Sequence, residues 1–208
     1  KGKKPPRLTG QALKAKRSPK EHLALLHQMH ERQEAALYDL PNWIAQFSNV
    51  LFASHDDATK SHRYQCSQMG VKIAEFPETE EAAAAAIDLG GSVVLGAPNV
   101  MRGSSHKGNV SARDLVKQNL CTALASDYHY PSLLQAALQL AAQIGFENAW
   151  PLVSSNPASV LGLHDRGSIS AGQRADFIVL NADLRLEAAF SNGRPAFITG
   201  EFAARLLA

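Results

Sequence analysis

Four short β-rich runs, each followed by a helical stretch, constrain the fold of this chain more than any other feature. The runs span 49–57, 71–76, 92–99 and 120–127, and the helical stretches span 60–69, 78–89, 112–119 and 132–144. Strands and helices that alternate at about 25-residue spacing are typical of parallel βαβ units. Several runs are apolar on successive residues, which indicates strands buried on both faces. We therefore predict an α/β fold with a parallel sheet.

The segment before this pattern differs in character. Residues 1–20 carry basic side chains and no acidic one, which is typical of a solvated, mobile arm. Residues 20–38 have helical periodicity, with Ser18 as the expected N-cap and Pro19 at the first position. Three histidines on this helix are spaced too loosely for a metal site, so we interpret them as part of a polar helix face: His22, His27 and His30.

The segment after residue 144 predicts a small β unit. A helix is expected with Ser155 or Asn156 as its N-cap and Pro157 at its first position. Short strands are expected at 175–182, 186–193 and 195–200. Asn192 and Gly193 have the composition of a tight hairpin turn.

Composition excludes several classes of protein. The net charge is only +2, so there is no case for a nucleic-acid partner. No apolar run reaches the about 20 residues that cross a membrane. Cys66 and Cys121 lack metal or redox spacing, so we expect reduced cysteines and a cytoplasmic protein. No G-x-G-x-x-G follows a strand, which argues against dinucleotide binding.

Each predicted strand ends in polar side chains, where parallel α/β folds place their active sites. Asp127 ends the fourth run, and its carboxylate could bind a metal or accept a proton from an attacking water. The alternative, that Asp127 caps the helix beginning near Pro131, stays open. His55 ends the first run and is a good ligand for Zn²⁺. The alternative there is a loop histidine beside a capping Asp56 or Asp57.

The segment 99–109 combines cations with glycines. Arg102, His106 and Lys107 offer positive charge, and the glycines let backbone N–H groups approach an anion. A polyphosphate or carboxylate would be bound in this way. A solvent-exposed loop without a ligand is the alternative.

Four sequence elements together resemble one family: SHDDAT at 54–59, EFPET at 75–79, LGAPNVMRGSSHKGNVSA at 95–112 and ASDYHYPSLL at 125–134. They are similar to the motifs of the α-D-ribose 1-methylphosphonate 5-triphosphate diphosphatases, which act in the carbon–phosphorus lyase pathway and are amidohydrolases. The tail from 156 to 180 resembles the closing segment of the wider superfamily. The resemblance extends over about residues 45–208.

The resemblance implies a TIM-type (β/α)8 amidohydrolase barrel, of which this chain is the C-terminal half, followed by a β-sandwich segment. It implies a divalent metal, zinc by preference, with His55 and Asp127 as ligands and Asp127 as the catalytic proton acceptor. The substrate would be a small phosphorylated ribose. The expected substrate-binding residues are Asn99, Arg102, His106, Lys107 and Asn109. Three further residues would orient the ligands or serve as ligands themselves: Asp56, Asp57 and Glu75.

The chain also departs from the family. Amidohydrolases open with an H-x-H pair on the first strand, and no H-x-H occurs here. A second histidine is common on the strand that here ends at Glu75. Together with the Lys start, this leads us to expect a fragment in three parts: 1–44 as a basic arm and helix, 45–150 as the last four βα units and 151–208 as the closing segment.

Two other functions remain alternatives to diphosphate release. One is a different amidohydrolase that acts on a C–N bond, such as a deaminase or a cyclic amidase. The other is an inactive truncated relic, or a module that associates with another half-barrel. The sequence leaves open whether the chain forms a homo-oligomer.

Overall fold

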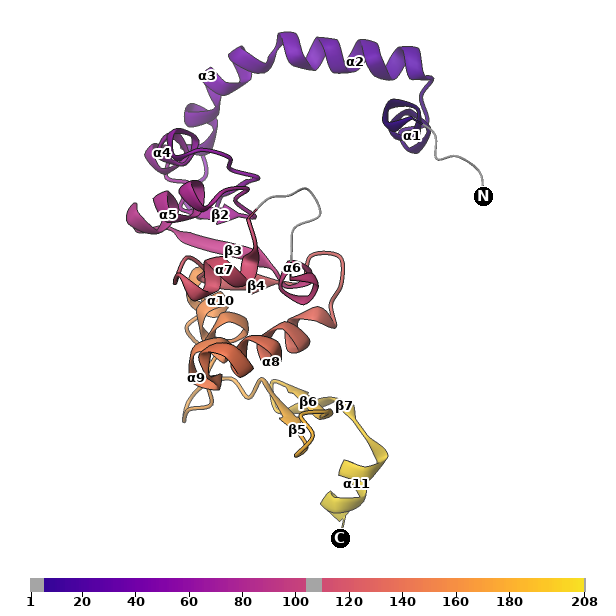
Figure 1. Cartoon of the computed structure of the whole chain (residues 1–208), viewed down its shortest axis with the longest axis vertical. Helices are drawn as coiled ribbons and strands as arrows, with labels where there is room; N and C mark the ends of the chain where they lie inside the picture. The colour runs from indigo at the N-terminus through magenta and orange to yellow at the C-terminus, as the bar shows by residue number, and fades with distance from the viewer. Residues whose placement is uncertain (1–5, 104–109, 208) are drawn as a thin grey trace. The chain divides into compact units, whose positions relative to one another are not determined.

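The computed structural model describes residues 6–103 and 110–207. The chain divides into two compact units, Lys1–Val50 and Leu51–Ala208, and most of their helices and strands are labelled in Figure 1. Within the described residues, no helix is long and apolar enough to cross a bilayer. The finer division at 1–44, 45–150 and 151–208 stays a prediction.

The described part of the first unit contains the helices α1 (Arg7–Lys14), α2 (Pro19–Glu31) and α3 (Gln33–Ile44). The basic segment is therefore not a mobile arm throughout, because α1 lies within it. The Ser18 hydroxyl accepts a hydrogen bond from the Glu21 N–H, and the Glu21 carboxylate accepts one from the Ser18 N–H. This reciprocal capping box, with Pro19 following, confirms the predicted helix start.

The second unit begins with a four-stranded parallel sheet in the order β1-β2-β3-β4. Its strands are β1 (Ala53–His55), β2 (Ile73–Glu75), β3 (Ser92–Gly96) and β4 (Ala123–Ala125). All four predicted strands are confirmed, with shorter bounds than the apolar runs. The third ends earlier than expected, because the chain enters a helix at Ala97 and Asn99 is helical.

Helices connect the strands: α4 (Lys60–Gln68), α5 (Glu80–Asp88), α6 (Ala97–Arg102), α7 (Ala112–Lys117) and α8 (Ser132–Ile144). Three of them begin at a hydroxyl cap: Thr59, Thr79 and Ser111 each accept a hydrogen bond from the N–H three residues later. Such caps satisfy a backbone donor that the helix cannot. The predicted helices are thus confirmed, with α6 as an addition.

The register divides the sheet into two faces, because successive side chains of a strand point to opposite sides. Ser54, Ala74 and Val93 are paired across the sheet on one face, and Ala74 and Val93 are fully buried. His55 and Glu75 are paired on the other face, where His55 is exposed and Glu75 is half-buried. The helices therefore bury the first face far more completely than the second.

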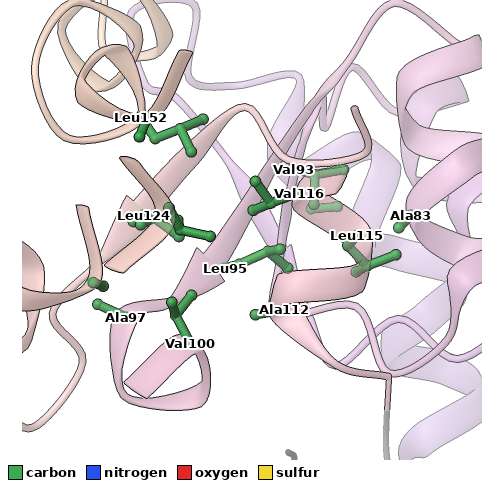
Figure 2. Packing of buried hydrophobic residues seen from close by; sticks show 14 of the residues in the cluster. Ala83, Val93, Leu95, Ala97, Val100, Ala112, Leu115, Val116, Leu124 and Leu152 are labelled. Carbon is green, nitrogen blue, oxygen red and sulfur yellow. The ribbon is translucent and has the colours of Figure 1, made fainter. Parts of the chain in front are cut away.

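The hydrophobic core lies between the buried face of the sheet and its helices. Val93 and Leu95 of β3 and Leu124 of β4 form one cluster with Leu115 of α7 and Leu140 of α8. Figure 2 shows β3 side chains gathered with those of α7. Fully burying one such side chain contributes about 1.5–3 kcal/mol, so this cluster holds the βα units together.

After α8 the chain forms α9 (Phe146–Ala149), a 3-10 turn η1 (Trp150–Val153) and α10 (Ser155–Val160). The expected capping of α10 is wrong in detail. Ser154 is the N-cap, it makes no side-chain cap bond, and Pro157 is the third residue of the helix. The Asn156 amide instead donates to the Thr122 carbonyl at 2.9 Å, which ties α10 to the start of β4.

A three-stranded antiparallel sheet follows, made of β5 (Phe177–Leu180), β6 (Leu186–Ser191) and β7 (Arg194–Ile198), and α11 (Gly200–Leu207) ends the described chain. Asn192 and Gly193 have φ of 52° and 72°. Two positive φ values in a two-residue loop match the tight hairpin turn predicted there. The Asp176 carboxylate accepts a hydrogen bond from the Asn192 N–H at 2.7 Å, which fixes the turn.

The start of β3 has room only for a glycine. A Cβ at Gly91 would lie 2.4 Å from the Lys72 carbonyl oxygen and 2.9 Å from that of Ala86, and both are backbone atoms. We expect Gly91→Ala to lower the free energy of unfolding by about 1–3 kcal/mol, as overpacked sites do. Urea unfolding followed by circular dichroism measures the change. Gly200→Ala is the control, because nothing lies within 4 Å of its Cβ position; equal losses for both would contradict the prediction.

Candidate active site

His55 and Glu75 form the part of the candidate site that the sheet itself positions. They are direct partners in the β1–β2 register, at the carboxyl ends of both strands. Adjacent strands lie about 4.8 Å apart, so the two side chains leave the same face as neighbours. His55 also packs edge-on against Phe76, with ring centroids 5.2 Å apart. The structure thus brings together an imidazole and a carboxylate at the ends of two neighbouring strands.

Asp56 and Asp57 have different surroundings although they are adjacent. Asp56 has φ of 59° and lies with its carboxylate 3.3 Å from the His55 Nδ1 atom. This position suits the orienting role expected of it. Asp57 is fully buried, and its Oδ2 atom accepts from the Ser54 hydroxyl at 2.5 Å and from the Arg63 Nη1 atom at 3.1 Å. Its carboxylate therefore joins α4 to the core face of β1, away from the face that carries His55.

Asp127 lies exposed just beyond β4, with φ of 51°. The interpretation that it caps the next helix is not supported, since the N-cap of α8 is Pro131 and no side chain makes a cap bond there. β1 and β4 are the two edge strands of this sheet. At about 4.8 Å between neighbouring strands, the ends of β1 and β4 near His55 and Asp127 lie about 14 Å apart in a flat sheet. The two side chains can bind one ion only if the sheet curls so that the face with His55 is concave.

Asn99 and Arg102 both belong to α6. The Asn99 amide oxygen accepts a hydrogen bond from the Ala112 N–H at 3.2 Å, so this side chain fixes the start of α7. The Arg102 Nη1 atom donates to the Tyr128 hydroxyl at 2.6 Å. Arg102 thereby stands beside the residue that follows Asp127. His106, Lys107 and Asn109 lie outside the described residues, and their substrate-binding role stays a prediction.

Two features of the site were not expected from the sequence. The Arg113 guanidinium donates to the Val100 carbonyl at 2.6 Å and to the Gln139 side chain at 2.8 Å, which anchors α6 to α7 and α8. The donor atoms of Asp57, His62 and Cys66 lie within 4.8 Å of one another. The four-residue spacing of His62 and Cys66 on one helix was a signal for this second group.

Solved structures of known proteins share the fold of this chain. No protein-family model matches the chain. The structure aligns with β-aspartyl dipeptidase from Fervidobacterium islandicum AW-1 at a TM-score of 0.63 and 12% identity, over 79% of this chain and 54% of that one. It aligns with the crystal structure of an amidohydrolase at a TM-score of 0.57 and 16% identity, over 75% of this chain and 46% of that one. The chain has an α/β fold with a parallel sheet, similar to that of amidohydrolases.

The sequence comparison is more specific. Over 164 residues the chain is 42% identical to the α-D-ribose 1-methylphosphonate 5-triphosphate diphosphatase of Escherichia coli (strain K12), a match that covers 73% of this chain and 43% of the relative. The resemblance stated from the four motifs is confirmed. The chain spans less than half the length of this relative.

The buried Arg63 makes α4 sensitive to its replacement. Arg63 is fully buried, pairs with Asp57 and donates to the Val71 carbonyl at 2.9 Å. Arg63→Met leaves a buried carboxylate without its cation, so we expect a loss of about 3–5 kcal/mol in the free energy of unfolding. Arg166→Met is the control, because its pair with Asp165 is partly exposed and such ion pairs add little to the free energy of unfolding. A loss below about 1 kcal/mol in Arg63→Met urea unfolding would refute this role.

Proposed function

We propose that this chain is the C-terminal part of a metal-dependent hydrolase of the amidohydrolase superfamily, whose whole protein releases diphosphate from α-D-ribose 1-methylphosphonate 5-triphosphate. The observation that carries the proposal is the 42% identity to the Escherichia coli diphosphatase. The strand-end groups support it, because His55 and Glu75 end two strands of one parallel sheet and Asp127 lies just beyond a third.

The sheet supports a half-barrel more than a doubly wound fold. The strand order follows the chain from β1 to β4 without the reversal that a doubly wound sheet contains. Ala74 and Val93 are buried on one face of the sheet, whereas His55, Glu75 and Val94 on the other face are exposed or half-buried. A (β/α)8 barrel has this arrangement, with its helices outside and its strand ends around the active site. The three-stranded sheet after α10 would belong to the closing β-sandwich.

The strand-end residues fit a divalent cation by their chemistry. An imidazole and two carboxylates are the ligand types found in catalytic zinc sites, which use three protein ligands. His55 and Asp127 would hold the ion, and Glu75, the register partner of His55, is the candidate third ligand. The ion would supply electrostatic activation of water toward the phosphoric anhydride. Asp56 keeps the His55 ring oriented through its Nδ1 atom.

The chain's own residues supply the remaining chemistry. The Asp127 carboxylate would accept the proton of the attacking water. Arg102 would bind the anionic substrate through its guanidinium, and its contact with Tyr128 directs it toward the Asp127 segment. A substrate with several negative charges explains an arginine at position 102, whereas the neutral ring substrate of a C–N hydrolase would not require one.

A chimaera tests the reaction. Residues 45–208 replace the corresponding part of the Escherichia coli diphosphatase, and diphosphate release from the 5-triphosphate substrate is measured. We expect activity with divalent metal, and a kcat about 10²–10⁴-fold lower in Asp127→Asn, since a proton acceptor contributes that much. Asp183→Asn is the control, in an exposed turn before β6. A folded chimaera without activity, or with equal activity in both variants, would overturn the proposal.

The anion-binding role of Arg102 has its own test in the same chimaera. Arg102→Ala should raise KM about tenfold or more, because a hydrogen bond to a charged group contributes about 1.5–3 kcal/mol. Bound metal should stay unchanged, which separates substrate binding from loss of the metal ligands. Arg166→Ala is the matched control, a half-buried arginine that pairs with Asp165. Unchanged kinetics in Arg102→Ala would remove the phosphate role.

The isolated chain should lack this activity. Its sheet has two edge strands, β1 and β4, and unpaired edges favour association. We expect no diphosphate release above background and a concentration-dependent increase in light scattering. Clear turnover of the substrate by the isolated chain would contradict this expectation.

A further inference from the structure

Asp57, His62 and Cys66 form a compact group at the base of α4. One donor atom from each residue lies within 4.8 Å of the other two. His62 and Cys66 are four residues apart on α4, so their side chains leave the same face of the helix. Asp57 reaches them from the turn after β1. A carboxylate, an imidazole and a thiol are thus brought to one point by adjoining elements.

One carboxylate oxygen of Asp57 lacks a hydrogen-bond partner among the described residues. The Asp57 carboxylate is fully buried, and its Oδ2 atom is bound by Ser54 and Arg63. Its Oδ1 atom has no hydrogen-bond partner among the described residues. The His62 Nδ1 atom faces it at 3.4 Å. A buried carboxylate oxygen without a donor is costly, and a cation between the two atoms would remove that cost.

The separation of the two atoms suits a tetrahedral ion. Bonds of about 2.0–2.1 Å at a tetrahedral angle place oxygen and nitrogen ligands about 3.3–3.4 Å apart. The observed distance from Asp57 Oδ1 to His62 Nδ1 is 3.4 Å. The Arg63 guanidinium occupies the opposite oxygen of the same carboxylate, so it orients the ligand without blocking Oδ1.

We propose that Asp57, His62 and Cys66 bind a zinc-like divalent cation that fixes α4 to the end of β1. A thiolate and an imidazole together select zinc among the common divalent ions, and the carboxylate completes three protein ligands. His62 is half-exposed, which leaves a path for the ion and a position for water. The ion would be structural, because the group lies with the core-face residue Ser54 while His55 stands on the other face of β1.

Cobalt(II) titration of the full chain is the test, because a thiolate bound to Co²⁺ gives a ligand-to-metal absorption band in the near ultraviolet. We expect one equivalent of Co²⁺ to produce the band. Cys66→Ser should abolish it, and His62→Ala should weaken binding by at least about tenfold, since even outer-shell partners contribute 10–100-fold. The strand-end group of His55, Glu75 and Asp127 contains no thiol and gives no such band, so the two sites are distinguished.

Cys121→Ser is the matched control, since Cys121 is the other free cysteine and its Sγ atom contacts the Ala123 carbonyl at 3.4 Å. The Cys121→Ser variant should keep the cobalt–thiolate absorption band. Absence of the band in the unchanged chain, its persistence in Cys66→Ser or its loss in Cys121→Ser would each overturn the proposal. Circular dichroism of His62→Ala and Cys66→Ser should give the spectrum of the unchanged chain. Loss of the absorption band then reports loss of a metal ligand and not unfolding.

Discussion

Burial of one face of a parallel sheet is the constraint on which the second unit depends. Val93 and Leu95 point into the helices, and their strand neighbours in register do the same. Parallel sheets in proteins are covered on both faces. Here the second face carries the partly exposed Glu75 and Val94. The second unit therefore buries one face of its parallel sheet under helices and leaves the other face partly exposed.

This one-sided burial also determines where chemistry can occur. Side chains on the core face serve packing, and Ser54 and Arg63 show the consequence, because the polar groups there are bonded to each other. Side chains on the opposite face remain available at the strand ends. His55 is available in this sense, whereas Ser54, its neighbour in β1, is bonded to Asp57 and Arg63 on the core face. Alternation along a strand thus assigns neighbouring residues to different tasks.

Much of this architecture could be predicted from the sequence. The four strands, the helices between them and the hairpin turn at Asn192 and Gly193 follow from local patterns: apolar runs, hydroxyl caps and residues that accept positive φ. The early end of the third strand was missed, although the sequence contains a local signal for it. Asn99 looked like a strand-end residue, but Pro98 occupies the first turn of α6, where a proline is favoured. The local signal for helix outweighed the apolar run.

By itself, the sequence determined which residues stand at strand ends and which chemical groups they offer, because these depend on positions along the chain. Tertiary structure alone decided which groups meet. It paired His55 with Glu75 through the register, brought Arg102 to Tyr128 across 26 positions and buried Asp57 against Arg63. Register, helix packing and burial are properties of contacts between segments, and no local pattern in the sequence specifies them.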